Sequence, residues 1–355
     1  MRDKRNRLQV GTVYVLGAGA SYSATLTSGA VSPTTTPLDN QFCNRIANLD
    51  YVRPGWVGEA VRELDRNWKD HQAFDSFGLE AAIIRHLSHL KFFDSIDRRR
   101  RTRLAAPDYI DVLAHLITFV LRRCKESRGN MLRQFVSHVF PLRQRVTEAG
   151  SNRIITFNYD DLLDQHMLKR FSPQLVYFDK IMNSRDDGNR STVRNTKPLL
   201  VKLHGSVNWR CSTEEFRRVI DPPLGSDEPY LIDRIWFAPS GSPSPEDDES
   251  PCIVPPMPEK PLTQVKLFRY LWTRACEYLH EAEELVICGY SLPETDDLAM
   301  SMFGNIKNDR LQHVTVIDPN PEILARWRSL LIRRGVRRAE WHYHSDFCEY
   351  VEALQ

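Results

Sequence analysis

The sequence predicts an α/β protein built on a doubly wound parallel sheet, and two observations lead to this prediction. Short apolar runs bounded by turn residues recur along the 355-residue chain, as expected of strands that are buried on both faces. Segments with helical periodicity separate these runs, so strand and helix signals alternate. The predicted strands cover residues 13–16, 153–157, 199–203, 285–288 and 313–317.

The helical patterns cover residues 42–49, 81–92, 109–125, 131–139, 161–169, 262–280 and 321–334. Residues 8–50 and 150–355 are predicted to form the core of a single domain that spans residues 1–355. The signals between them are almost all helical, so residues 51–149 are predicted to form a helical insertion domain. Residues 241–261 contain seven prolines, which indicates a surface loop.

Composition argues against several classes of protein. The chain has 48 basic and 46 acidic residues, so no strong positive field favours direct nucleic-acid binding. The arginine run at 98–103 fits a solvated helix end, with phosphate contact as the alternative. No stretch approaches the roughly 20 apolar residues of a membrane span, and no signal-like segment is evident, so a cytoplasmic location is expected. The seven cysteines are dispersed without a Cys-x-x-Cys pair, and no metal site is expected.

The first predicted strand runs directly into a glycine turn, Gly17-Ala18-Gly19-Ala20-Ser21. Glycine lacks a Cβ and lets a ligand approach the backbone closely. The helix predicted to follow offers unpaired N–H groups and the positive end of its dipole. These five residues are therefore predicted to bind a pyrophosphate, although glycine turns after strands are common.

Polar residues also follow the other four strands, at the edge where an open α/β sheet binds its ligand. Turn and helix-cap roles are the structural alternative for each of them. An amide, a carboxylate and an imidazole at this edge suit the binding of a ribose and the activation of a hydroxyl group or water. The candidate residues are Asn158 and Asp160 after the second strand, His204 after the third, Gly289 and Ser291 after the fourth, and Asp318 and Asn320 after the fifth.

Five motifs in this order resemble the sirtuin-like (silent information regulator) NAD-consuming domains, and in particular a divergent bacterial branch found in anti-phage defence. They are GAGAS at 17–21, TFNYDD at 156–161, KLHGS at 202–206, CGYS at 288–291 and IDPNP at 317–321. The resemblance implies a Rossmann-like core and NAD+ as substrate. It also implies that Asn158 binds the nicotinamide ribose and holds a water, and that His204 is the general base.

The chain departs from the protein-deacylating sirtuins at three points. Phe157 stands where their motif has glutamine, the Asp-Phe-Arg of their cofactor loop is missing, and the cysteines cannot build their four-cysteine zinc module. These departures favour a simpler reaction, hydrolysis of NAD+ to nicotinamide and ADP-ribose, with no zinc. The resemblance further implies an NAD-depleting effector of antiviral defence, active in abortive infection. Activation is expected through a homo-oligomer or through a partner such as an Argonaute-like protein or a DNA-translocating ATPase.

Three alternatives stay open. The chain could be an NAD-dependent protein deacylase or ADP-ribosyltransferase, or a non-catalytic sensor of NAD+ or ADP-ribose. A dehydrogenase is disfavoured because Asp39, the acid about 20 positions beyond the glycine turn, follows a Ser/Thr/Pro loop instead of a strand. Glu80 stands at the start of a helical pattern. Two roles stay open for it: its side chain could face the site, or it could complement the dipole of the helix.

Overall fold

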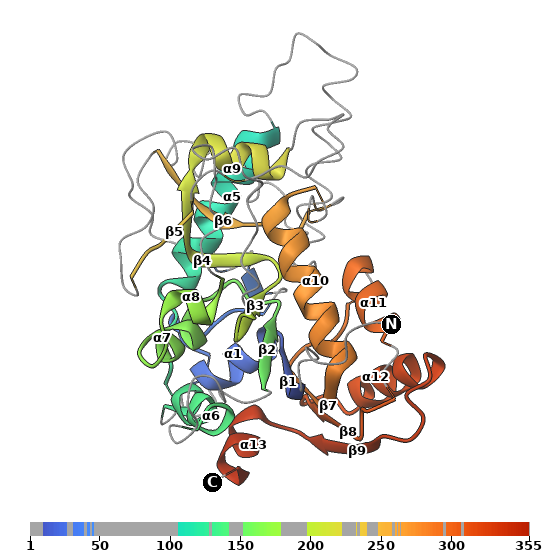
Figure 1. The fold of residues 1–355 in the computed structure, drawn as a ribbon. Helices are drawn as coiled ribbons and strands as arrows, with labels where there is room; N and C mark the ends of the chain where they lie inside the picture. The colour runs from blue at the N-terminus through green and yellow to red at the C-terminus, as the bar shows by residue number, and fades with distance from the viewer. Residues whose placement is uncertain are drawn as a thin grey trace, which may run out of the picture.

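The computed structural model describes two β-sheets with helices packed around them (Figure 1). The residues it describes are 10–26, 31–38, 41–42, 45, 106–127, 130–141, 152–178, 197–221, 232, 235–239, 248–257, 260, 262, 264–293, 296–306 and 309–354. The predicted features at Glu80, 81–92 and 98–103, most of 42–49 and the whole of 51–105 lie outside these residues.

The larger sheet has six parallel strands in the order β3-β2-β1-β7-β8-β9. Numbered along the chain within this sheet alone, that order is 3-2-1-4-5-6, which is the order of Rossmann-like folds. The strand order therefore reverses direction between β1 and β7. In open α/β sheets, ligands bind outside the carboxyl ends of the strands at such a point. The strands are β1 Val10–Leu16, β2 Arg153–Thr156, β3 Leu200–Lys202, β7 Ala282–Cys288, β8 His313–Ile317 and β9 Glu340–His344.

Helices cover both faces of this sheet (Figure 1), which explains why residues 13–16 of β1 and 285–288 of β7 are apolar and buried. On one face, α13 (Phe347–Ala353) contacts α1 (Ala18–Thr25) and α6 (Met131–Val139), and α6 contacts α7 (Leu162–Leu168). The short helix α8 (Pro173–Val176) adjoins α7. On the other face, α10 (Lys266–Glu281) lies against β1, β3 and β7, followed by α11 (Asp297–Gly304) and α12 (Glu322–Arg333).

The smaller sheet is antiparallel, with the order β5-β4-β6, and was not predicted. Its strands are β4 (Gly205–Ser212), β5 (Trp236–Phe237) and β6 (Glu249–Ile253). Helices α5 (Ala106–Leu121) and α9 (Thr213–Ile220) contact it. Because β6 is largely buried, the expected surface loop at 241–261 contains a core strand. Pro251 is tolerated there because β6 is an edge strand.

The described part of the predicted insertion, 51–149, divides between the two sheets. Helix α5 packs on the smaller sheet, whereas α6 belongs to the helical layer of the larger one. The Phe135 ring of α6 lies edge-on to Tyr14 of β1 at 5.1 Å and to Phe347 of α13 at 5.4 Å. Residues 131–139 therefore pack with the helical layer of the larger sheet.

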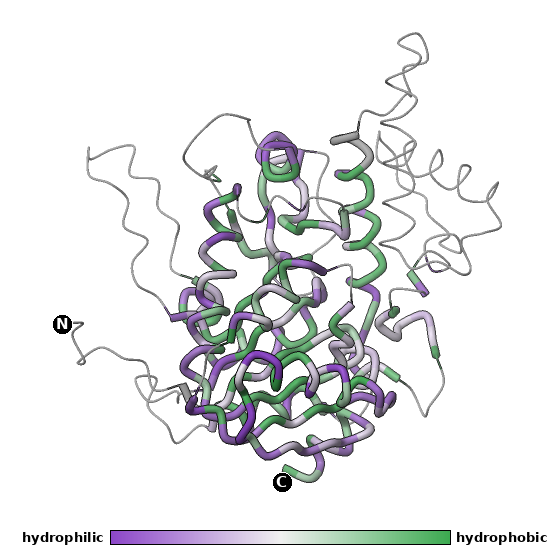
Figure 2. Tube along the Cα trace, turned by 90° about the vertical axis from the view of Figure 1, so that its right-hand side faces the viewer, coloured by the Kyte–Doolittle hydropathy of each residue, from purple (hydrophilic) through white to green (hydrophobic). Residues whose placement is uncertain are grey.

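Hydrophobic and hydrophilic residues alternate along the trace, as amphipathic helices around a core require (Figure 2). Among the residues that the structure describes, no helix is long and apolar enough to span a membrane.

Candidate functional site

Two glycine turns meet where the winding of the large sheet reverses. The N–H of Gly17 donates to the carbonyl of Cys288 at 2.9 Å, and the N–H of Gly19 donates to the carbonyl of Gly289 at 3.0 Å. Gly289 has a φ of +58°, and a Cβ there would lie 2.4 Å from the Ala20 nitrogen. A Cβ on Gly17 would lie 2.4 Å from the Gly289 oxygen. The glycines thus allow two backbone segments to pack directly against each other.

This packing restricts how the first turn can bind a pyrophosphate. The N–H groups of Gly17 and Gly19 already donate to the second turn, and that of Ala20 donates to the carbonyl of Gly17. Ala18 is exposed at the start of α1, and the side chain of Ser21 is buried. The face of the turn open to a ligand is therefore the region around Ala18, at the positive end of the helix.

Asn158 ties the end of β2 to the first glycine turn. Its Nδ2 donates to the carbonyl of Gly17 at 2.9 Å and to Oγ of Ser21 at 3.0 Å, and its own N–H donates to Oγ1 of Thr156 at 3.0 Å. Asn158 is only partly buried. Its amide protons are committed to the turn, so the role left to its side-chain oxygen is that of an acceptor.

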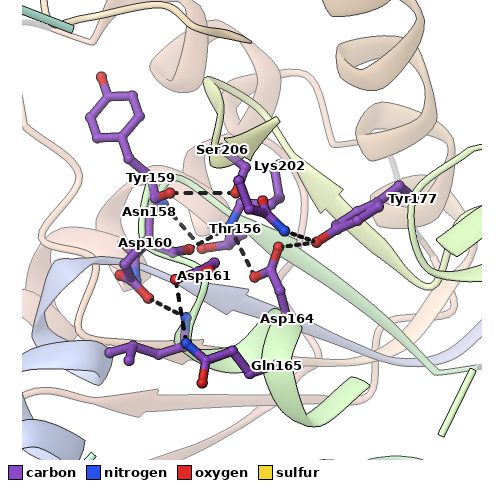
Figure 3. A network of polar contacts seen from close by, with 12 residues as sticks. Thr156, Asn158, Tyr159, Asp160, Asp161, Asp164, Gln165, Tyr177, Lys202 and Ser206 are labelled. Carbon is purple, nitrogen blue, oxygen red and sulfur yellow. Dashed lines mark hydrogen bonds and ion pairs between the residues drawn. The ribbon is translucent and has the colours of Figure 1, made fainter. Parts of the chain in front are cut away.

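Beside the loop that carries Asn158 lies a buried polar network that the sequence analysis did not predict (Figure 3). The ammonium group of Lys202 donates to the backbone carbonyl of Asp160 and to Oδ2 of Asp164, the latter at 3.0 Å. The other carboxylate oxygen of Asp164 accepts from the Tyr177 hydroxyl, which in turn accepts from Nδ2 of Asn208 at 3.0 Å. All five residues are buried. The network joins β3 and the small sheet to the loop that carries Asn158.

Burial governs the titration of these groups. It raises the pKa of both Asp160 and Asp164, and the positive charge of Lys202 opposes that rise in each case. Burial and the nearby Asp164 carboxylate also raise the pKa of Tyr177 well above its usual value, so this phenol stays protonated and remains a donor. The network therefore consists of the Lys202–Asp164 pair and the hydrogen bonds that Tyr177 and Asn208 add to it.

His204 lies at the end of β3, in a buried aromatic environment. Its ring centroid is 5.7 Å from that of Phe157, 6.0 Å from Tyr159 and 6.1 Å from Trp272. The main chain around it is fixed, since the N–H of Val254 donates to the His204 carbonyl at 2.9 Å. Phe157 itself stacks on Tyr290 with 3.9 Å between centroids. The phenylalanine that replaces the expected glutamine is thus part of an aromatic cluster.

The imidazole of His204 is neutral at physiological pH. Burial and the positive charge of Lys260 lower its pKa to about 3, against the opposing effects of Asp296 and a hydrogen bond with the Phe157 backbone. The interaction with the Phe157 backbone raises the pKa because it favours the protonated ring, but burial outweighs it. Nε2 is buried and has no hydrogen-bond partner among the residues described. A buried acceptor without a partner is unusual and marks a position for a ligand or water.

The remaining predicted residues lie at neighbouring strand ends, where their described contacts are those of turns and caps. Ser291 is exposed, and its carbonyl accepts from Nη1 of Arg326 at 3.1 Å. One carboxylate oxygen of Asp318 accepts from the N–H of Asn320, and the side-chain oxygen of Asn320 accepts from the N–H of Glu322, the first residue of α12. Burial raises the pKa of Asp318. One oxygen of Asp318 therefore has a structural role in the turn before α12.

The structure brings Asn158 into contact with Gly17 and Ser21, and it places His204 at the end of the adjacent strand β3. No hydrogen bond between Asn158 and His204 is described; Phe157, the neighbour of Asn158 in the chain, contacts the His204 ring instead. Sequence reasoning missed Lys202, Asp164 and Trp272, the last of which donates to the carbonyl of Leu203 at 3.1 Å. A lysine inside the apolar third strand was the one signal that could have pointed to a buried partner.

Comparison with protein families matches residues 152–337 to the SIR2-like domain, which is more than half of the chain. The chain belongs to the SIR2-like family. This membership agrees with the six-stranded Rossmann-like sheet. It also indicates a function that uses NAD+. The match includes Asn158, His204 and Gly289, while the first glycine turn lies before it. No curated protein matches the chain.

Proposed function

We propose that this SIR2-like chain is an NAD+ glycohydrolase that cleaves the nicotinamide–ribose bond to give nicotinamide and ADP-ribose. The single observation that carries the proposal is the unpartnered Nε2 of His204, buried next to the loop that bears Asn158. A buried lone pair at the ligand-binding edge suits a ribose hydroxyl or a water as its donor. The seven dispersed cysteines support plain hydrolysis over a zinc-bearing deacylase.

The leaving nicotinamide takes the bonding electron pair and becomes neutral, while positive charge develops on the ribose. Water then adds to the anomeric carbon and loses a proton. The oxygen of Asn158 can accept a hydrogen bond from this water and so orient it, because its amide protons are held by Gly17 and Ser21. Asp160 supports this loop through its backbone contact with Lys202.

His204 has a pKa of about 3 in the free protein, so its ring is neutral and can accept a hydrogen bond, but it is a weak base. Lys260 contributes to that low value. An anionic pyrophosphate near Lys260 would offset its charge and raise the pKa of His204. Substrate binding itself would then bring the imidazole closer to the range in which it accepts a proton from water or a ribose hydroxyl.

The test is chromatography of NAD+ incubated with the purified chain, alone and with the proteins encoded beside it. Release of nicotinamide and ADP-ribose in equal amounts supports the proposal. The variants His204→Ala and Asn158→Ala should lower turnover by about 100-fold or more, the usual loss on removing a general base. The exposed residues His138 and Asn305 provide the matched controls His138→Ala and Asn305→Ala. Near-normal turnover in a folded His204→Ala protein would show that the assigned role is wrong.

The biological part of the proposal is NAD+ depletion in bacterial anti-phage defence, after activation by self-assembly or by a partner protein. The support is the resemblance of the five motifs to that branch. Measurement of cellular NAD+ after phage infection, in cells carrying the wild type or His204→Ala, tests it. Equal NAD+ levels in the two strains would argue against a depleting effector.

A non-catalytic sensor is the second candidate function, and the low pKa of His204 favours it. A neutral acceptor that never gains a proton can still bind a ribose hydroxyl. Calorimetric binding of NAD+ without release of nicotinamide, by a chain assembled with its partner, would support the sensor over the hydrolase.

A further inference from the structure

Two histidines and a glutamate gather on one face of the large sheet, at the end opposite the glycine turns. His313 is the first residue of β8 and Glu340 is the first residue of β9, and the two are register partners. His342 follows Glu340 by two positions on β9, so it lies on the same face. Since the glycine turns follow the carboxyl ends of their strands, this cluster is separate from the proposed NAD+ site.

The geometry of the cluster fits a small metal ion. Nδ1 of His313 lies 3.5 Å from Oε2 of Glu340, and one ligand atom from each of the three residues lies within 4.8 Å of the others. The two imidazole centroids are 6.1 Å apart. Bonds of about 2.0–2.1 Å in a tetrahedral site place ligand atoms about 3.4 Å apart, so only His342 must move closer. It is exposed and free to rotate into place.

Strand pairing places the first two ligands side by side. Glu284 of β7 is the register partner of His313 on its other side, but its carboxylate accepts from Oγ1 of Thr12 at 2.8 Å. Glu284 is thereby turned toward β1, and His313 faces Glu340. The sheet fixes the three Cα positions, which reduces the conformational entropy lost when an ion binds.

We propose that His313, Glu340 and His342 bind a divalent transition-metal ion of the zinc class. Two imidazoles and one carboxylate are ligands that suit zinc, cobalt or nickel and do not suit magnesium or calcium. Three protein ligands leave a fourth position for water or for a donor from another molecule. An ion here would tie β8 to β9, the edge strand of the sheet, and would stabilise the folded chain. The sequence analysis expected no metal because it considered cysteine spacing alone.

The experiment titrates the purified full chain with Co²⁺ and with Zn²⁺ and measures the visible absorption of cobalt, binding heat and thermal unfolding. We expect one ion per chain, cobalt bands typical of nitrogen and oxygen ligands, and a higher unfolding temperature. His313→Ala and His342→Ala should each weaken binding at least tenfold, whereas His138→Ala should leave it unchanged.

Equal binding by the His313→Ala and His342→Ala proteins would overturn the proposal. Absence of binding at millimolar metal concentrations would do the same, as would an intense sulfur-to-cobalt charge-transfer band, which would assign the ion to cysteine. Nicotinamide release plays no part in these readouts, so failure here is independent of the proposed NAD+ hydrolysis.

Discussion

Lowering the pH from 7 to 5 should destabilise the wild type more than the His204→Gln variant. The pKa of His204 is about 3 in the folded protein, compared with its ordinary value of 6.5. Between these two values the unfolded chain binds one proton that the folded chain does not. Stability is therefore retained above pH 6.5 and is lost as the pH falls toward the folded pKa.

The size of the effect follows from the same two values. At pH 5 the unfolded imidazole is 1.5 pH units below its ordinary pKa of 6.5, and each unit corresponds to about 1.4 kcal/mol. The free energy of unfolding should fall by about 2 kcal/mol more for the wild type than for the variant. The raised pKa values of Asp160 and Asp164 act in the opposite direction, but to a first approximation they act in both proteins and cancel in the difference.

Urea unfolding followed by tryptophan fluorescence at pH 7, 6 and 5 measures this difference. Glutamine does not titrate and still offers an amide donor for the Phe157 backbone. Parallel curves, with the same loss of stability in both proteins, would refute the claim that His204 is buried in its neutral form. A larger loss of unfolding free energy in the His204→Gln variant than in the wild type would likewise contradict it.

Two further comparisons test the packing beneath the site. Gly289→Ala should prevent the two glycine turns from meeting and should cost far more stability than Gly335→Ala; both have positive φ, but a Cβ at Gly335 meets nothing within 4 Å. Similar unfolding temperatures for the two variants would contradict the close packing of Gly289 against the first glycine turn. Lys202→Met should destabilise the fold by about 3–5 kcal/mol, since it leaves Asp164 as an uncompensated buried carboxylate. Adding Asp164→Asn to Lys202→Met should recover part of that loss in urea unfolding, and a purely additive double variant would show that the pair is not coupled.

The five strands predicted from apolar runs are all present, because strands buried on both faces leave a continuous hydrophobic signal. The sixth strand, Glu340–His344, was missed because it lies at the edge of the sheet and carries polar residues that reach solvent. The small sheet was missed for a related reason. The prolines around β6 indicate a loop. A strand forms there because β6 pairs with β4 on one side only, and an edge strand can accommodate proline.

The candidate site was predictable to the extent that polar residues directly follow strands. Asn158 and His204 could be placed at one edge because β2 and β3 are adjacent and parallel. The use of the Asn158 amide to hold Gly17 could not be predicted, since the contact joins residues far apart in the chain. The pairing of Lys202 with Asp164 depends on burial, which composition and spacing do not report.

The central position of β1 has a consequence for how the protein is made. Leu16 pairs with Cys288, so β1 gains its second neighbour only after β2, β3, the small sheet and β7 have left the ribosome. Until Gly289 is synthesised, no backbone segment is present to hold Gly17 and Gly19. A nascent or prematurely terminated chain that stops before this point therefore lacks the assembled rim on which NAD+ chemistry would depend.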